Sequence, residues 1–282
     1  MAFKSILTVV INADGASAPM DAAVALARRE DAHLDVLCLG IDRTQNGYYY
    51  IGAAPMAPVI LQETLDQARD DAKATEAAVR KRLDAEDIRW AIATGIAQSG
   101  AVGREVSHLA RFSDLVVLPK PYGKGSLPDS ESILEAALFE GRAPVLMLPA
   151  GQFDAKYGRR VVIAWNHSDE AMKAVRCALP ILKTASGVSV AVIDPGAYGS
   201  ERSDPGGRLS RFLARHGVRT EVSVLARTLP HISEEINRHV TDIDADMVVM
   251  GAYSHSRFRE AILGGATRDM FENAKVPIFT AH

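Results

Sequence analysis

The chain repeats itself, and this repeat constrains its fold more than any other feature. Residues 5–42 and residues 160–194 share one pattern: a β-branched run, a polar turn, an alanine-rich stretch and a second apolar run that ends in Ile-Asp. The repeat aligns Asn12 with Asn166 and Asp42 with Asp194. A length of 282 residues is enough for two domains of ordinary size. We therefore predict two copies of one fold.

The two halves also end alike. Residues 115–118 and residues 247–250 are continuous apolar runs that each follow an aspartate, and such runs suit strands buried on both faces of a parallel sheet. Strands that alternate with amphipathic helical stretches indicate an α/β fold in each half. Glycine and polar residues interrupt the pattern near residues 149–160. We place one domain on each side of this interruption, over residues 1–150 and residues 158–282.

Composition argues against several classes of function. The formal net charge of −3 provides no broad positive field for nucleic acid or for an anionic membrane. Cys38 and Cys177 each lie in an apolar stretch, which suits reduced thiols in a cytoplasm rather than a catalytic pair or a metal site. The N-terminal segment has no cleavage pattern, and no apolar run reaches membrane-spanning length. We expect a cytoplasmic protein that binds neither nucleic acid nor membranes.

The run GAYSHSRFREAILGGAT, residues 251–267, starts with glycine after a predicted strand and ends just after a Gly-Gly pair. Glycines let a backbone approach phosphate groups closely and adopt positive φ. A helix that starts near Gly265 adds free N–H groups and the positive end of its dipole. Local positive charge comes from Arg257, Arg259 and Arg268. A strand end, a surface loop and a helix start explain the same residues without a ligand.

Several segments together resemble the universal stress protein family in its tandem, two-domain form. They are VVIAWNHSDEAMKAV, ADMVVMG, residues 251–267 and AKVPIFTAH, and the resemblance covers nearly the whole chain. It implies in each half an open, mainly parallel, five-stranded sheet with helices on both faces, and it implies a homodimer. In the nucleotide-binding branch of the family, ATP lies across the carboxyl ends of the strands. Other members lack the phosphate-binding pattern and do not bind ATP.

That pattern is Gly, two residues, Gly, nine residues, then Gly followed by Ser or Thr. The second half matches it in part, with Gly251, Ser254, Gly264 and Gly265 at the four positions and Thr267 two residues after the last. The resemblance thus implies an ATP or ADP site in the second half, with His255 as a further donor. In the first half, Pro119 and Pro121 cannot donate N–H bonds to a phosphate. We predict that the first half keeps the fold without the site.

The resemblance also implies a base and ribose side, lined at strand ends by Ala164, Trp165, Val192 and Asp194, with Asn166 near the adenine and metal side. Asparagine is a poorer ligand for a hard cation than a carboxylate, so we predict no metal ligands and doubt magnesium dependence. Structural alternatives stay open for both groups. Asn166 suits a turn or a helix N-cap, for which Ser168 and Asp169 are also suited, and the apolar residues suit a core.

Two other clusters have both a functional and a structural interpretation. The glycine- and proline-flanked tyrosines Tyr48–Tyr50 suit a lid, a dimer contact or packing on their own domain. His231, Glu235 and His239 are spaced to share one helix face, as metal ligands can be, but a solvated helix face has the same spacing. We favour the solvated face.

No catalytic constellation of recognised spacing occurs in the sequence. We therefore predict a universal-stress-type protein that binds ATP or ADP in its second half. Its expected role is nucleotide-responsive regulation or stress tolerance, as a homodimer with an unidentified protein partner. One alternative is a nucleotide-independent binding or scaffold protein with a relic site. The other is a slow ATP hydrolase.

Overall fold

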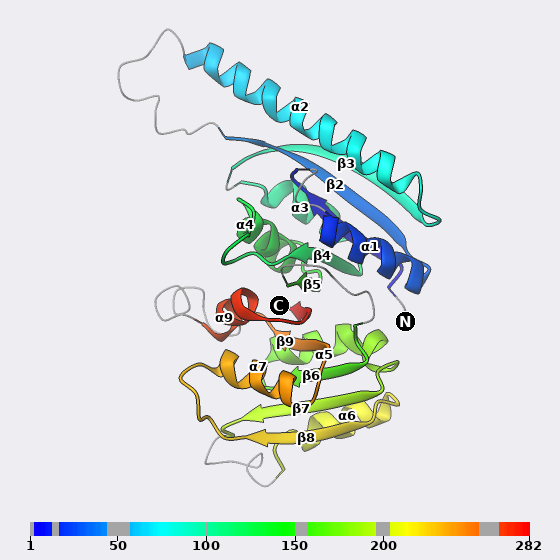
Figure 1. Cartoon of the computed structure of the whole chain (residues 1–282), viewed down its shortest axis with the longest axis vertical. Coiled ribbons are helices and arrows are strands. Elements are labelled where there is room, and N and C mark those ends of the chain that lie inside the picture. The colour runs from blue at the N-terminus through cyan, green and yellow to red at the C-terminus, as the bar shows by residue number, and fades with distance from the viewer. Residues whose placement is uncertain are drawn as a thin grey trace. The chain divides into compact units, whose positions relative to one another are not determined.

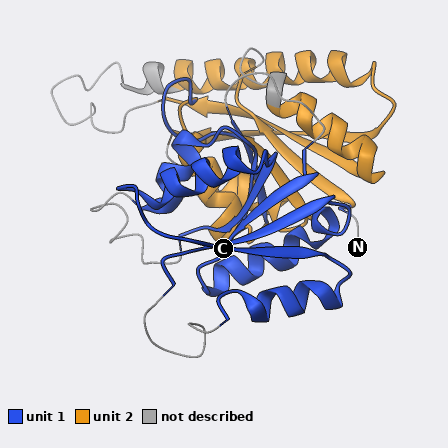
Figure 2. Cartoon of the chain, turned by 60° about the horizontal axis from the view of Figure 1, so that its bottom comes forward, with its two compact units in different colours: residues 1–3, 119–126, 144–282 blue, residues 4–118, 127–143 orange. Residues whose placement is uncertain are grey.

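The computed structural model describes residues 3–12, 17–43, 57–99, 101–149, 157–195, 204–253 and 265–282. The chain divides into two compact units (Figure 2). Unit 1 comprises residues 1–3, 119–126 and 144–282, and unit 2 comprises residues 4–118 and 127–143. Most of the second half of the sequence therefore belongs to unit 1.

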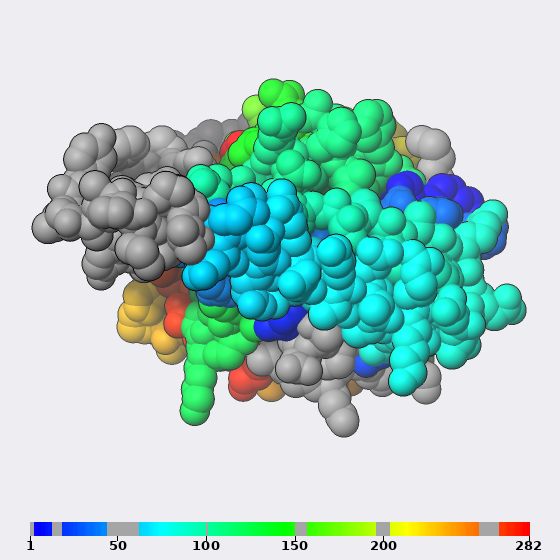
Figure 3. Space-filling view, turned by 90° about the horizontal axis from the view of Figure 1, so that it is seen from above, coloured from blue at the N-terminus to red at the C-terminus, as the bar shows by residue number. Residues whose placement is uncertain are grey.

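Unit 2 is built on four parallel strands in the order β3-β2-β1-β4. Its elements are β1 (Ser5–Val10), α1 (Ser17–Glu30), β2 (His33–Asp42), α2 (Ala57–Leu83), β3 (Arg89–Gln98), α3 (Gly103–Ala110), β4 (Leu115–Pro119), α4 (Ser130–Glu135) and η2 (Ala136–Glu140). Helix α2 packs closely on β2, where a Cβ on Gly40 would collide with the carbonyl oxygen of Ala68. The other side of α2, drawn in cyan, lies at the surface (Figure 3).

Unit 1 contains a sheet in the order β8-β7-β6-β9-β10-β5, which is parallel except that β5 runs antiparallel to β10. Its elements are β5 (Val145–Leu148), β6 (Arg160–Ala164), α5 (Asp169–Leu182), β7 (Gly187–Ile193), α6 (Gly207–Arg215), β8 (Thr220–Leu225), α7 (Ile232–Asp242), β9 (Met247–Gly251), α9 (Ala266–Asn273) and β10 (Ile278–Ala281). Strands β6 to β8 advance in one direction and β9 to β10 in the other. Right-handed crossovers then place α5 and α6 on one face and α7 and α9 on the other (Figure 1).

The aspartates that precede β4 and β9 have the same role in the two halves. Asp114 Oδ2 accepts hydrogen bonds from the amides of Lys4 and Ser5 at 2.7 and 3.1 Å. Asp246 Oδ1 accepts bonds from the amides of Gly158 and Arg160 at 3.0 and 3.1 Å. Each carboxylate ties the chain that enters the first strand of its half to the start of the fourth strand. The sequence repeat is therefore also a structural repeat.

The predicted fold class is confirmed: both halves form α/β structures on parallel strands, and residues 158–282 contain five of them. The compact units divide the chain differently from the predicted domains, since unit 1 includes β5 and residues 119–126. The division into residues 1–150 and 158–282 stays a prediction about the repeat. None of the described helices has the length and apolar character needed to cross a membrane.

Candidate functional site

The carboxyl ends of β6 and β9 lie side by side at the switch point of the unit 1 sheet. Ala164, the last residue of β6, pairs with Met250 of β9. The chain leaves β6 to form β7 on one side and returns to form β9 on the other. Open α/β sheets take ligands in the crevice outside such strand ends. Ala164 and Gly251 are the last residues of β6 and β9, and Trp165 and Asn166 directly follow β6, so the fold brings these four predicted nucleotide contacts to one edge.

Gly251 ends β9 and packs against the first turn of α5. A Cβ on this residue would lie 2.5 Å from the amide nitrogen of Ala171 and 2.7 Å from the carbonyl carbon of Glu170. Both are backbone atoms, which cannot rotate away. Gly251 is not among the described glycines with positive φ. Close packing of a helix is thus a sufficient reason for glycine at this position.

The turn after β6 is held by its own hydrogen bonds. Asn166 Oδ1 accepts a bond from the amide of Ser168 at 3.1 Å, and Ser168 Oγ accepts one from the amide of Ala171 at 3.1 Å as the N-cap of α5. The indole nitrogen of Trp165 lies 3.1 Å from Nδ1 of His167, whose φ is +63°. The Asn166 side chain therefore has the structural role of a turn residue, and Ser168 is the N-cap of α5.

Helix α9 begins at the same edge of the sheet without a capping side chain. Its N-cap is Gly265, with φ of −82° and ψ of 148°, and among the described residues no side chain caps the first turn. The free amides of such a helix start attract anions. Thr267 is buried, and its Oγ1 accepts a bond from the amide of Tyr253 at 3.2 Å. The two described parts of the run 251–267, residues 251–253 and 265–267, therefore contact each other.

The two helix starts at this edge differ in charge. Helix α5 is capped by Ser168 and carries Asp169 and Glu170 in its first turn, and these acidic groups already complement its positive end. Helix α9 carries Arg268 beside Asp269, whose carboxylate lies 3.5 Å from the imidazole of His231. The first turn of α9 thus carries one basic and one acidic side chain, whereas that of α5 carries two acidic ones.

Comparison with known proteins agrees with this architecture. Residues 158–282 match the model of the universal stress protein family. These residues therefore form a domain of that family. The universal stress protein Slr1230 of Synechocystis is 31% identical over 74 residues, which are 26% of this chain and 25% of that protein. The chain thus matches about a quarter of the length of this curated relative.

Solved structures extend the likeness to the whole chain. A universal stress protein from Archaeoglobus fulgidus superposes with a TM-score of 0.72 at 14% identity, over 98% of this chain and 95% of that one. A functionally unknown protein from Pseudomonas aeruginosa PAO1 gives a TM-score of 0.57 at 16% identity, over 99% and 92% of the two chains. Identities this low show the fold alone. Both halves of the chain share that fold.

The other predicted site residues are placed as follows. Val192 is 2% exposed and packs beside Gly206. It is therefore a core residue, which was the structural alternative for this position. Asp194 is exposed after β7, with φ of +45° and its amide bonded to the carbonyl of Leu225. Ala164 and Trp165 are half-buried. Ser254, His255, Gly264 and Tyr48–Tyr50 lie outside the described residues, and their roles stay predictions.

The residues considered as a metal set make separate contacts. Glu235 is fully covered rather than solvated, and its Oε1 accepts bonds from the amides of Thr228 and Leu229 at 2.5 and 2.6 Å. The His239 ring lies 3.0 Å from the hydroxyl of Ser189. In the described part of the chain, no group of three His, Cys, Asp or Glu residues is placed to hold a metal ion. Glu235 instead fixes the loop that joins β8 to α7.

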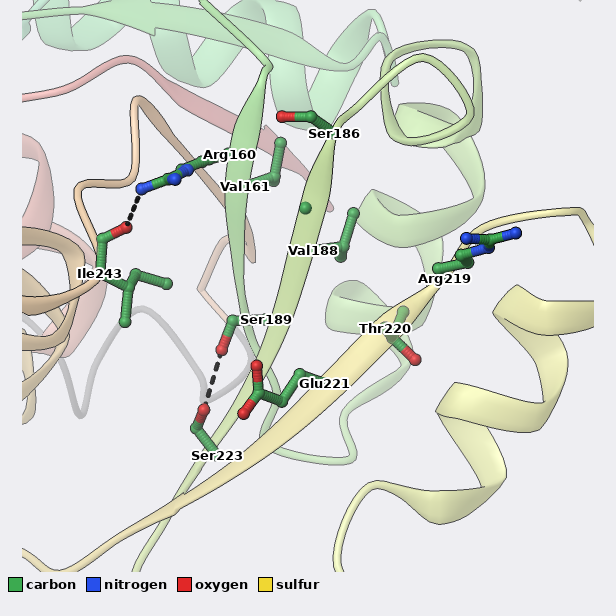
Figure 4. Close-up of a pocket in the computed structure, with 11 residues that line it drawn as sticks. Arg160, Val161, Ser186, Val188, Ser189, Arg219, Thr220, Glu221, Ser223 and Ile243 are labelled. Atoms are coloured by element: carbon green, nitrogen blue, oxygen red, sulfur yellow. Dashed lines mark hydrogen bonds between the residues drawn. The ribbon is translucent and has the colours of Figure 1, made fainter.

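A cleft of about 410 Å³ lies at the opposite edge, by the amino ends of β6, β7 and β8. Figure 4 shows the hydroxyls of Ser189 and Ser223 pointing toward each other, at 3.0 Å, while the Arg160 and Arg219 side chains point away from them. Burial lowers the pKa of His239, against the opposing pull of Asp242 and Glu221, so the ring bonded to Ser189 is neutral at pH 7. Through His239, the pair of hydroxyls links α7 to the sheet.

Sequence reasoning missed two tyrosines close to the candidate site. The hydroxyls of Tyr122 and Tyr253 are hydrogen-bonded at 2.9 Å, and both side chains are buried. The two residues are 131 positions apart, and no spacing rule links positions so distant. One local signal was present: Tyr122 lies between Pro121 and Gly123, and proline and glycine at such positions are typical of a fixed turn.

Proposed function

We propose that the second half of this chain binds the phosphate groups of ATP or ADP outside the carboxyl ends of β6 and β9. The observation that carries the proposal is the start of α9: an N-cap glycine with no capping side chain, at the switch point of an open α/β sheet. Arg268 adds positive charge in the first turn. The resemblance of residues 251–267 to the family's phosphate pattern supports the same location.

The residues that the structure describes fit phosphate groups at this helix start. The first amides of α9 would supply the donors, and glycine at the N-cap adds no side chain in front of them. On the base side, Trp165 and Asn166 follow β6, and the exposed Asp194 follows β7. These residues would hold adenine and ribose. Phosphate contact would fix the position of α9 and so change the surface offered to a second copy or to a protein partner, which is the regulatory role we propose.

Calorimetric titration with ATP, ADP and adenosine tests the proposal, with Gly265→Asp as the decisive variant. The φ and ψ of Gly265 are those of an ordinary N-cap, so aspartate there caps α9 and does not unfold it. Its carboxylate occupies the free amides and repels phosphate. We expect the variant to keep its Tm and to lose at least tenfold in ATP affinity. Gly265→Asn, which caps without charge, should lose less. Absence of binding heat from the wild type at millimolar ATP would overturn the proposal.

A specific observation favours the alternative of a nucleotide-independent binding or scaffold protein. Gly251 has a packing reason to be glycine, and Asn166 and Thr267 already accept internal hydrogen bonds. A site retained only as a structural relic has these properties. Phosphate release during the ATP titration tests the second alternative, slow hydrolysis, in the same samples.

A further inference from the structure

The segment that follows β4 packs against the second half of the chain, within unit 1. Pro119 and Pro121 fix φ at two of its positions. Gly123 then turns the chain with φ of +83°, and a Cβ on it would lie 3.0 Å from Cγ of Glu272 in α9. In the sequence repeat, residues 119–126 start at the end of β4 as the residues of the predicted phosphate pattern start at the end of β9. We call them the Pro119–Ser126 segment.

Tyr122 is the residue of this segment that contacts the candidate site. Its side chain is 6% exposed, and its hydroxyl lies 2.9 Å from the hydroxyl of Tyr253. The guanidinium carbon of Arg268 lies 4.7 Å from the centre of the Tyr122 ring, a cation–π contact. One side chain thus contacts Tyr253, two residues after the end of β9, and Arg268 in the first turn of α9.

Tyr253 has an unfavourable backbone conformation that needs such support. Its φ is +54°, in the left-handed region that bulky residues avoid. Its amide donates to Thr267 Oγ1 at 3.2 Å, and its ring meets Phe271 edge to face at 6.3 Å. Backbone strain of this kind persists only where surrounding contacts impose it. The bond to the Tyr122 hydroxyl is one of these contacts.

We propose that Tyr122 is a positioning residue for the phosphate end of the second-half site. The inference rests on the proposed function and adds to it a residue from the first half of the sequence. Tyr122 fixes the direction in which the chain leaves β9 and the place of the Arg268 guanidinium. It acts through Tyr253 and Arg268 and does not itself bind the nucleotide. Its effect is therefore confined to phosphate groups and does not extend to adenine or ribose.

The test measures the affinities of ATP and adenosine by calorimetry for the full chain and for Tyr122→Phe. The variant keeps the ring that stacks with Arg268 and removes only the hydroxyl that bonds Tyr253. Tyr157→Phe is the matched control, because Tyr157 lies just before β6, at the opposite edge, and is also 6% exposed. We expect Tyr122→Phe to weaken ATP about fivefold, the size of one buried hydrogen bond, and to leave adenosine unchanged. The control should leave both affinities unchanged.

Two further variants separate positioning from a general loss of structure. Tyr253→Phe removes the same bond from its other end, so the double variant should bind ATP no more weakly than the weaker single variant. Gly123→Ala opposes the positive φ of the segment and contacts Glu272, and should weaken ATP selectively as well. Equal losses for ATP and adenosine, or unchanged ATP affinity in Tyr122→Phe, would overturn the inference while the proposed function stands. A wild type that binds no ATP overturns both.

Discussion

Replacing Gly251 with alanine tests whether helix packing requires a glycine at the end of β9. The added Cβ would lie 2.5 Å from the nitrogen of Ala171, and 2.7 and 2.9 Å from the carbonyl carbon and Cβ of Glu170. Ordinary van der Waals contact with a Cβ begins at 3.4 Å, so the first turn of α5 must move away from β9. Overpacking costs about 1–3 kcal/mol. We expect about 2–3 kcal/mol, because the nearest atoms are backbone.

Tryptophan fluorescence can measure this destabilisation in the second half of the chain alone. The chain has two tryptophans, Trp90 in β3 and Trp165 directly after β6. In a Trp90→Phe background, the fluorescence transition follows Trp165 alone. We expect Gly251→Ala to lower its Tm by roughly 5–10 °C. Gly187→Ala is the matched control, since a Cβ there meets only Cγ of Arg160, at 4.0 Å, and should leave Tm nearly unchanged.

If Gly251→Ala and Gly187→Ala melt together, the close approach of α5 does not account for the glycine. The comparison also decides how binding data are interpreted. A loss of ATP affinity in Gly251→Ala would not identify a phosphate contact, because the variant displaces the start of α5 as well. Gly265→Asp has no such ambiguity, and for this reason it carries the functional test.

Further predictions concern three buried polar side chains: Glu235 and Thr280 in unit 1, and Thr8 in unit 2. Burial alone would raise the pKa of Glu235, but hydrogen bonds from Thr228 and Leu229 and the charge of Arg238 outweigh it and hold the pKa below its ordinary 4.5. Its contribution to stability is therefore complete above about pH 4.5 and is lost as the pH falls below that value; Glu235→Gln should lower the urea midpoint at pH 7 and flatten its dependence on pH. Thr280 Oγ1 is fully buried and has no hydrogen-bond partner among the described residues, so Thr280→Val should stabilise the protein by about 1 kcal/mol. Thr8 is equally buried but donates to the carbonyl of Val117 at 2.9 Å, so Thr8→Val should destabilise it by about 1 kcal/mol.

Each of these predictions has an outcome that contradicts it. An unchanged urea midpoint in Glu235→Gln at pH 7 would mean that the loop between β8 and α7 does not depend on the carboxylate. If both threonine variants change the free energy of unfolding in the same direction, the hydrogen bond of Thr8 is not what distinguishes the two sites. Denaturation by urea, followed by circular dichroism, measures both changes in one set of samples.

The fold could be predicted because its signals are local and occur twice. Buried parallel strands need continuous apolar runs, and residues 115–118 and 247–250 have them. Asp114 and Asp246 were aligned by the repeat alone, and the structure gives both the same hydrogen-bonding role. What the repeat did not indicate is where the compact units divide. The placement of β5 depends on its pairing with β10, which lies more than 120 residues later in the chain.

The site was harder to predict because one residue type satisfies different physical requirements. A glycine at the end of a strand suits a phosphate, a positive φ or a closely packed helix. For Gly251 the deciding neighbours are Ala171 and Glu170, about 80 positions earlier in the chain. Asn166 suits both a ligand contact and a turn; its bond to the amide of Ser168 establishes the turn, and the ligand contact stays a prediction. Glu235 looked solvated by its spacing, yet it is fully covered.

The predicted loss of the phosphate site in the first half and the contacts of Tyr122 have one physical explanation. Proline removes N–H donors, so Pro119 and Pro121 disqualify the Pro119–Ser126 segment as a phosphate loop. Proline also removes backbone freedom, and a segment with two fixed φ values holds a side chain at one position with little loss of entropy. Tyr122 lies directly after the second proline. The two prolines that we predict to prevent phosphate binding in the first half therefore also suit this segment to the proposed positioning role. If that role holds, a tandem chain keeps its first half for this reason, because cutting the halves apart would remove Tyr122 from the proposed site.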